Sequence, residues 1–353
     1  MHHELRTSLI RSFEVPTQAE LLALKKAMST RYLAKATLET VTTFAAAATA
    51  IKPSQNVVGV GVGTKFSDGK ETATRCVRFY VVDKIHKAAL SSKQLLPSSV
   101  DGVPTDVIVT GKFRMLSSAS NNKLKRRPIR PGTSIGFEFP PPKDNFVMAG
   151  TFGAVVTKSG KQYILSNNHV LAENGQIALG SRIFQPGLLD GGNATTDQVA
   201  TLAQFIDIKE SGMNKVDCAI AEILGTIAVN ARHMPSVGKL SSTTPITPAE
   251  NMLVMKTGRT TGHTRGKIFD IFADTNVEYE DKDGNVFVAT FSNQILIVGT
   301  PGSFSTNGDS GSLIVDRATK QATGLLFAGS ATHTIANRIE DVLSALGVTL
   351  VTA

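Results

Sequence analysis

The feature that most constrains the fold is a series of short apolar segments that begins near residue 147 and continues almost to the end of the chain. Each segment is rich in Val, Ile, Leu or Phe, and turn-forming residues such as Gly, Asn and Asp separate it from the next. Such segments are typical of β-strands. A helical pattern returns only at 336–347, in ANRIEDVLSALG. This region is therefore expected to be all-β, either a sandwich or a pair of barrels.

The N-terminal part of the chain has a different pattern. Residues 17–50 carry an apolar stripe with helical spacing, and Thr17 with Glu20 predicts a capping box at its start. From residue 56 onward, strand-like runs and turns predict a compact α+β unit of roughly 60 residues. The stretch at 116–132 is polar and basic, with prolines and glycines that favour an exposed linker.

The formal net charge of +8 is concentrated in one segment. Between Lys112 and Arg130 there are seven Lys and Arg residues and no acidic residue. A nucleic-acid-binding domain would spread positive charge over a whole face, so nucleic acid is not the expected partner. The favoured interpretation is a solvated linker. A patch for an acidic partner or nucleic acid, and a processing site within 112–130, remain the alternatives.

Several observations bear on the compartment. The N-terminus MHHELRTSLIRSFEV lacks the basic-then-apolar pattern of a secretory signal, and FAAAATAI at 44–51 is too short to cross a membrane. The two cysteines, Cys76 and Cys218, lie in strand-like runs and are interpreted as buried and reduced. We therefore expect a cytoplasmic protein with no membrane attachment. No cluster of metal-ligand residues is evident, so neither a metal nor another cofactor is expected.

Ser310 lies between two glycines in NGDSGSL at 307–313. Glycine permits unusual backbone dihedrals, so the amides of Gly308 and Ser310 can point at one developing oxyanion. A serine hydroxyl becomes a good nucleophile only when a base takes its proton and another group orients that base. His169 is the candidate base, because it directly follows the strand-like run in QYILSNNHVLA.

Asp217 is the candidate orienting group, because it immediately precedes the apolar run in NKVDCAIAEI. A carboxylate at that place can be desolvated and can hold an imidazole in one tautomer. Asp190, Asp197 and Asp207 lie in the same interval, but none precedes an apolar strand as directly.

Two other patterns are assigned to structure rather than to ligand binding. The glycines of GVGVG at 59–63 are followed by a turn and a strand, whereas a dinucleotide loop needs a helix there, so a closely packed strand is predicted. The acidic stretch EDKDGN at 280–285 lacks the glycine and glutamate spacing of a calcium loop and is predicted to be a hairpin turn. His233, His263 and His333 lie in no motif, and only His333 is considered as a further pocket residue.

The three motifs together resemble those of the chymotrypsin-like serine peptidases. SNNHVLA is similar to the histidine motif of that family, VDCAIA to its aspartate motif and NGDSGSL to its nucleophile motif, in the same order and at similar spacing. Upstream segments, including NVVGVGVGTKF, VDGVPTDVIVTG and RRPIRPGTSIG, resemble bacterial intracellular trypsin-like peptidases, to which a plant leaf-width regulator is similar. The combined resemblance extends over residues 55–345 approximately.

This resemblance implies a mainly β fold of two antiparallel six-stranded β-barrels with the active site between them, preceded by a helix and a small α+β domain. On this chain it implies a helical segment at 1–52, an α+β domain at 53–115 and a basic linker at 116–147. The first barrel would then span 148–235, and the second barrel with its C-terminal helix 236–353.

The implied activity is hydrolysis of peptide bonds through an acyl-enzyme intermediate. His169 would be the general base, Asp217 its orienting group and Ser310 the nucleophile, with an oxyanion hole at Gly308 and Ser310. Phe304 stands six residues before the nucleophile, where trypsin has an acid that selects basic side chains. We therefore expect cleavage after a small or apolar residue, in a pocket formed with Phe327 and Gly329. Phe327 also lies near the position of a family serine that supports the aspartate.

Two alternatives concern activity and its control. The chain could be a catalytically silent barrel pair that binds peptides or acts as a scaffold. Residues 1–115 could inhibit the enzyme or drive homo-oligomer formation, with the basic linker as an activation site. The expected partner is a protein or peptide substrate, and homo-oligomerisation is left open.

Overall fold

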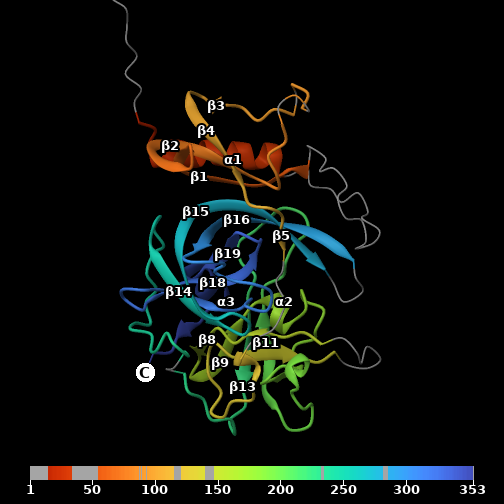
Figure 1. Cartoon of the computed structure of the whole chain (residues 1–353). Helices are drawn as coiled ribbons and strands as arrows, with labels where there is room; N and C mark the ends of the chain where they lie inside the picture. The colour runs from red at the N-terminus through yellow and green to blue at the C-terminus, as the bar shows by residue number, and fades with distance from the viewer. Residues whose placement is uncertain are drawn as a thin grey trace, which may run out of the picture.

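The computed structural model describes residues 15–33, 55–86, 88, 90–92, 94–114, 121–139, 147–231, 234–280 and 285–352. The predicted helix beyond residue 33, His233 and the centre of the 280–285 turn lie outside these residues. Within them the protein is mainly β, as the sequence predicts, and contains two large sheets. The N-terminal unit, the second barrel and the first sheet follow one another along the long axis of the molecule (Figure 1).

The N-terminal unit consists of one helix on a small sheet. Helix α1 (Gln18–Tyr32) begins with the predicted capping box of Thr17 and Glu20. Its apolar side chains, including Leu21 and Met28, pack on Val60 and Phe79 of the sheet. The strands of its sheet are β1 (Val57–Ser67), β2 (Lys70–Val81), β3 (Ser99–Val100) and β4 (Val103–Val109). The two-residue strand β5 (Phe113–Arg114) follows them and pairs with strands of the second sheet instead.

The first sheet has eight strands in the order β20-β8-β9-β13-β11-β10-β6-β7. The elements that build this part are β6 (Ser134–Phe137), β7 (Gly150–Thr151), β8 (Ala154–Lys158), β9 (Lys161–Ser166), α2 (Asn168–Leu171), β10 (Arg182–Phe184), the 3-10 helix η4 (Leu188–Asp190), β11 (Gln198–Phe205), β13 (Ala219–Ile223) and β20 (Thr349–Leu350). A short 3-10 helix, η3 (Asn121–Lys123), precedes it.

The second sheet contains a closed antiparallel ring of six strands in the order β16-β19-β18-β17-β14-β15, because β15 also pairs with β16. These strands are β14 (Leu253–Gly258), β15 (Gly262–Glu280), β16 (Val286–Gly299), β17 (Leu313–Asp316), β18 (Ala322–Gly329) and β19 (His333–Arg338). The short strand β12 (Met213–Asn214) adds to β16, and helix α3 (Ile339–Leu346) follows β19. The pairing of Glu280 with Val286 confirms the predicted hairpin there.

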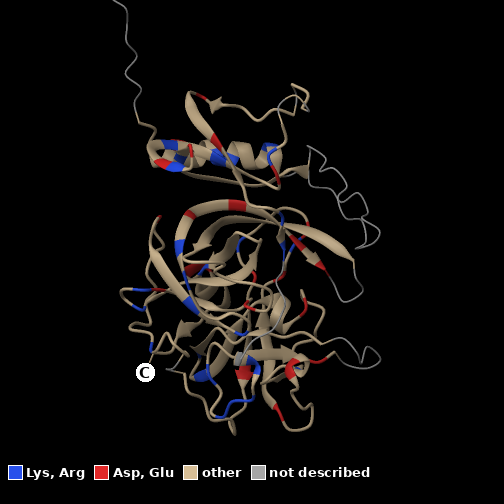
Figure 2. Ribbon diagram, in the orientation of Figure 1, with Lys and Arg blue, Asp and Glu red and all other residues tan. Residues whose placement is uncertain are grey.

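The N-terminal unit is continuous with the second barrel. Strand β1 pairs with β15 at Gly59–Thr275 and Val60–Asp274, so one hydrogen-bonded sheet runs from β12 to β3. Lys25 of α1 also reaches the barrel and donates to Asp274 at 2.7 Å with both side chains buried. Lys and Arg are interspersed with Asp and Glu over the unit and the barrels (Figure 2).

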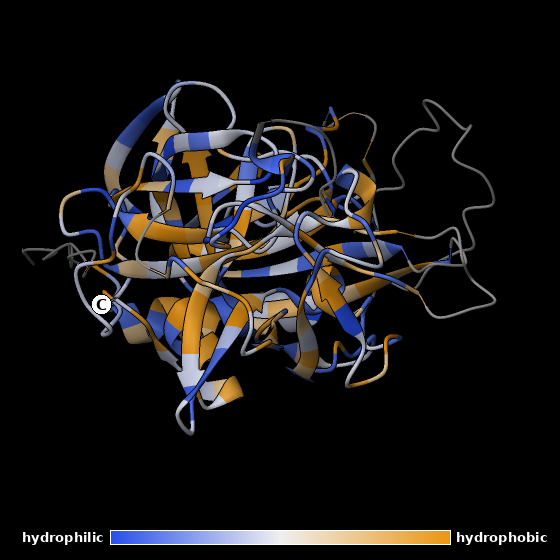
Figure 3. Cartoon of the chain, turned by 90° about the horizontal axis from the view of Figure 1, so that it is seen from below, coloured by the Kyte–Doolittle hydropathy of each residue, from blue (hydrophilic) through white to orange (hydrophobic). Residues whose placement is uncertain are grey.

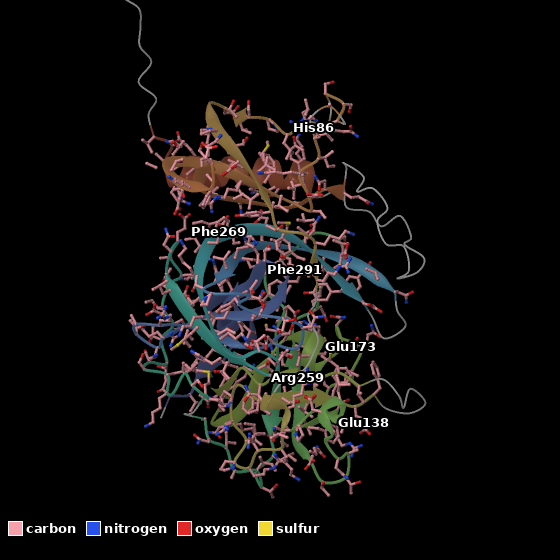
Figure 4. All side chains as sticks on the ribbon, in the orientation of Figure 1. His86, Glu138, Glu173, Arg259, Phe269 and Phe291 are labelled. Atoms are coloured by element: carbon pink, nitrogen blue, oxygen red, sulfur yellow. The ribbon has the colours of Figure 1, made fainter. Side chains whose placement is uncertain are left out.

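The glycines of GVGVG serve close packing, as the sequence predicts. A Cβ on Gly61 would lie 1.9 Å from Oδ2 of Asp270, and one on Gly63 would lie 2.2 Å from Cζ of Arg78. The room they leave is filled by the buried side chains of Arg78, Tyr80 and Asp270, with the Tyr80 hydroxyl hydrogen-bonded to Asp270. Arg78 Cζ lies 4.4 Å from the ring centroid of Phe269, which Figure 4 shows at the junction of the two units.

Separate apolar clusters fill the two sheets. Ile164 and Phe152 belong to the first, and Val254 and Ile297 to the second. A third cluster joins them, since it contains residues of β9 and β13 together with residues of β17 and β18. Hydrophobic residues recur along the strands, with hydrophilic ones between them (Figure 3). Among the described residues, no helix is both long and apolar enough to span a membrane.

Candidate active site

The structure brings His169 and Asp217 together. His169 lies in α2, directly after β9, and is 2% exposed. Its Nδ1 is 2.5 Å from Oδ2 of Asp217, which is fully buried before β13. The other carboxylate oxygen accepts the backbone amides of Asn168 at 2.7 Å and His169 at 3.4 Å. This side chain therefore fixes both the ring of His169 and the first turn that carries it.

Tyr279 of β15 provides a further contact to the same carboxylate. Its hydroxyl donates to Oδ2 of Asp217 at 3.0 Å, and its ring stands edge-on to the His169 ring with centroids 6.1 Å apart. Burial, and then the adjacent Asp217 carboxylate, raise the pKa of Tyr279 well above its ordinary value. The hydroxyl thus stays protonated and acts as a donor.

The backbone of Asp217 is also held in place. Its amide donates to the Asn337 side chain at 3.0 Å, and its carbonyl accepts from the Asn167 side chain at 2.8 Å. Asn337 in turn donates to Gln294 at 2.8 Å. Residues from both sheets therefore position the carboxylate, which fits a site built at their junction.

Ser310 lies on the loop before β17 and is 1% exposed. Its Oγ donates to the backbone carbonyl of Phe327 in β18 at 3.3 Å. Within the described part of the chain, Nε2 of His169 is buried without a hydrogen-bond partner. Gly150 connects the two regions, because a Cβ there would lie 2.6 Å from Val170, which follows His169, and 3.0 Å from the Ser310 carbonyl.

The loop around Ser310 has the backbone form that the glycines predict. Gly308 and Gly311 have φ values of +93° and +89°, in the region that favours glycine. The Gly308 carbonyl accepts from Thr151 Oγ1 at 3.0 Å. The amides of Gly308 and Ser310 donate to no acceptor among the described residues. Two neighbouring unpaired amides beside a hydroxyl have the composition of an oxyanion hole.

Asp309 anchors this loop through a buried ion pair that the sequence interpretation missed. Its Oδ2 lies 3.0 Å from Nζ of Lys256 in β14, and both side chains are 0% exposed. Its carboxylate also accepts the amides of Thr260, Thr261 and Thr306 at 2.9 to 3.1 Å. Burial lowers the pKa of Lys256 from its ordinary value, while the Asp309 carboxylate favours the charged form. The sequence signal for this ion pair was the lysine at the end of the apolar run LVMK at 253–256.

A second buried ion pair joins the first sheet region to the second barrel near this loop. Arg259, which follows β14, donates to both carboxylate oxygens of Asp190 in η4, at 2.5 and 2.6 Å. Its backbone amide donates to Thr151 Oγ1 at 2.9 Å. Asp190 had been considered only as an alternative to Asp217, and the structure gives it this contact instead. Figure 4 shows Arg259 where the first sheet meets the second barrel.

An open cavity of about 490 Å³ lies beside the loop. It is lined by Ser303, Ser305, Thr306 and Asn307 on one side, by Gly329, Ser330 and Ala331 on another, and by Gly111, Lys112 and Arg114 of the β5 region. Of the three predicted pocket residues, Gly329 is among the lining residues. Phe304 and Phe327 are buried in apolar clusters instead, at 2% and 0% exposure.

The arrangement thus defines a two-sheet, mainly β protein in which an imidazole–carboxylate pair and a glycine-flanked serine lie near the junction of the sheets. The comparison with family models gives a match over residues 205–339 to the Nal1 C-terminal domain. This match is in line with the resemblance to a plant leaf-width regulator. No match was found among curated proteins.

Several solved structures are similar in fold. Protease A of Thermobifida fusca is 19% identical, with a TM-score of 0.43 over 64% of this chain and 99% of that protein. The chymotrypsin of Cellulomonas bogoriensis is 16% identical, with a TM-score of 0.40 over 64% of this chain and 100% of that protein. A serine protease described as specific for glutamic acid, with a histidine triad in substrate binding, is 18% identical, with a TM-score of 0.42 over 63% and 100%. At such identities the likeness concerns the fold alone.

Proposed function

We propose that this chain is a serine endopeptidase. The observation that carries the proposal is the buried contact of 2.5 Å between His169 Nδ1 and Asp217 Oδ2, beside a loop that holds Ser310 and two free amides. A carboxylate that accepts from Nδ1 leaves Nε2 as the basic nitrogen of the ring. The ring can then take a proton from a neighbouring hydroxyl.

In the proposed reaction, Nε2 of His169 removes the proton of Ser310 as Oγ attacks the carbonyl carbon of the substrate. The amides of Gly308 and Ser310 stabilise the resulting oxyanion, each by about 3 kcal/mol. The imidazolium then gives its proton to the leaving amine, and an acyl-enzyme remains on Ser310. Water activated by the same nitrogen hydrolyses the ester and regenerates the hydroxyl.

The bond from Ser310 Oγ to the Phe327 carbonyl must break before attack. A rotation of the serine side chain about its Cα–Cβ bond moves Oγ between staggered positions and requires no movement of the backbone. A neutral hydrogen bond of this kind contributes only about 1 kcal/mol, so substrate binding can offset its loss.

Substrates in this proposal are peptides or proteins, with one side chain entering the cavity beside the loop that carries Ser310. The lining hydroxyls and Asn307 make this cavity more polar than Phe304 had implied. The protein would act in the cytoplasm, in keeping with two buried free thiols, Cys76 and Cys218. Its activity would be regulated by the N-terminal unit or by assembly.

Cleavage of an unbiased peptide mixture tests the proposal. We expect the wild-type protein to cut peptides at a defined set of sites, and Ser310→Ala to abolish this while the circular dichroism spectrum is unchanged. His169→Ala should reduce the rate by a factor of about 10⁴ or more. Cleavage by Ser310→Ala at the wild-type rate would contradict the assignment.

A second candidate function is peptide binding without cleavage, and the contact of Ser310 with Phe327 in place of His169 favours it. Under this alternative, the wild type would bind peptides, release no product and fail to react with a fluorophosphonate. The two functions therefore differ in a single covalent-labelling experiment.

A further inference from the structure

The edge of β18 beside Ser310 is the part of the sheet that an extended peptide would use. Up to Leu326, this edge of β18 is already paired. It pairs with β17, for example at Leu313–Leu325, and the Leu326 carbonyl accepts from the Gly311 amide of the nucleophile loop, which is the loop before β17 that carries Ser310. Beyond Leu326, the next contact along this edge is with Ser310, whose Oγ donates to the Phe327 carbonyl. A peptide that presents its carbonyl to Ser310 would add as a strand beyond this point, since exposed strand edges bind extended chains by main-chain hydrogen bonds.

Strand β5 already occupies that edge. Arg114 pairs with Gly329 of β18 in antiparallel orientation, two residues beyond Phe327. On its other side β5 pairs with β15, at Phe113–Val277 and Arg114–Glu278. The Phe113 side chain is 1% exposed and lies in an apolar cluster with Phe327 and Tyr279. The segment is thus inserted between two barrel strands next to the catalytic loop.

An ion-pair cluster holds β5 in this position. Glu278 of β15 accepts from Lys112 Nζ at 2.8 Å and from Arg114 Nε at 3.0 Å. These side chains are partly exposed, at 39% for Lys112, 55% for Arg114 and 24% for Glu278. The contact is therefore weak enough to open and close, as exposed ion pairs generally are.

The cavity beside the loop that carries Ser310 lies against β5, since Lys112 and Arg114 line one of its sides. A small reagent can therefore reach the nucleophile loop while β5 is in place. An extended peptide has an additional requirement, because its backbone needs the hydrogen-bonding edge that Arg114 fills at Gly329.

We propose that β5 is an autoinhibitory strand, which occupies the substrate-pairing edge of β18 and must be displaced before an extended peptide can bind. This inference rests on the proposed peptidase function. It gives the N-terminal unit a defined means of control, in which any partner or substrate that releases β5 activates the enzyme.

The test compares two rates in the full-length protein. One is the rate of Ser310 labelling by a small fluorophosphonate, which needs the nucleophile but not the edge. The other is kcat/KM for a series of peptides that extend one, two or four residues before the scissile bond. Glu278→Gln removes the ion pairs that hold β5 in place. Glu222→Gln is the matched control, because Glu222 pairs with Lys161 on the surface of the first sheet.

We expect Glu278→Gln to raise kcat/KM for the longest peptide about threefold, the size of effect that an exposed ion pair can have, and to leave the labelling rate unchanged. Glu222→Gln should change neither rate.

Several outcomes would overturn the inference. Equal kcat/KM for wild type and Glu278→Gln at every peptide length would show that β5 does not compete with the substrate. A fall in the long-peptide rate with unchanged labelling would show that β5 helps to bind it. If a folded wild-type protein is not labelled at all, the proposed peptidase function fails, and the inference fails with it.

Discussion

At the scale of single residues, the hydroxyl of Tyr279 is the contact that the motifs did not reveal. The family pattern directed attention to Phe327, whereas the donor to Asp217 comes from β15, 62 residues further along the chain. Val277 and Tyr279 are two residues apart in β15, and both side chains are buried. The partner of the Tyr279 side chain depends on how β15 curves around the barrel, and local sequence does not encode it.

Tyr279→Phe should lower kcat/KM about tenfold, because it removes one hydrogen bond to a charged acceptor that orients the imidazole. The fold should persist, since the ring remains in its apolar cluster. Steady-state kinetics on one peptide measure the effect. Tyr163→Phe is the control, because the Tyr163 side chain is also buried but lies in the apolar cluster between the sheets. Equal rates for Tyr279→Phe and wild type would remove Tyr279 from the site.

The pair of Lys256 and Asp309 is the second residue-scale feature. Lys256→Met leaves the buried Asp309 carboxylate without its cation and should cost about 3 kcal/mol in the free energy of unfolding. Because Asp309 adjoins Ser310, fluorophosphonate labelling should slow as well. Urea denaturation measures the first effect. Lys161→Met, on an exposed pair, should leave the free energy of unfolding essentially unchanged, and the same behaviour in Lys256→Met would refute the anchoring role.

His333 makes stability depend on pH. Burial lowers its pKa to about 4, so the folded protein favours the neutral ring while the unfolded chain protonates near its ordinary value of 6.5. The contribution of the neutral His333 ring to the free energy of unfolding is fully present above pH 6.5 and is lost as the pH falls from there through 4. As the pH falls from 7 to 4.5, the free energy of unfolding of His333→Gln should therefore rise relative to that of the wild type by about 2 to 3 kcal/mol. Denaturant melts at both pH values measure this, and a constant difference would contradict it.

At the scale of elements, the strands and the closing helix followed from apolar runs and turn residues, because those signals are local. The GVGVG strand was also predictable, but the reason for its glycines was not. They make room for Arg78, Tyr80 and Asp270, which come from two other strands. The two-residue strand β5 follows the strands of the N-terminal unit. Its pairing with both β15 and β18 is a long-range feature that no local pattern encodes.

Gly61→Ala tests the packing of β1. The added methyl would lie 1.9 Å from the Asp270 carboxylate, so the buried network must shift, and the free energy of unfolding should fall by about 2 to 3 kcal/mol. Gly225→Ala is the control, because no atom lies within 4 Å of the position its Cβ would take. Thermal melts of both variants give the comparison. Equal stability of the two would contradict the described packing.

At the scale of the whole molecule, the sequence separates the N-terminal unit from the barrels, whereas the structure makes β1 a neighbour of β15. Leu21→Ala creates a cavity under α1 and should lower the free energy of unfolding by about 3 kcal/mol. Hydrogen exchange should then show lower protection in β15 and β16 as well as in β1 and β2, because one sheet joins them. Loss of protection confined to the N-terminal unit would show that the two parts unfold separately.

The central claim is that Ser310 is a nucleophile activated by His169 and Asp217. Its most direct measurement is the reaction of the full-length protein with a fluorophosphonate, followed by intact mass and peptide mapping. The account predicts one adduct per chain, located on Ser310, and no adduct in Ser310→Ala or His169→Ala. A folded wild-type protein that remains unlabelled, or an adduct on another residue, would contradict it.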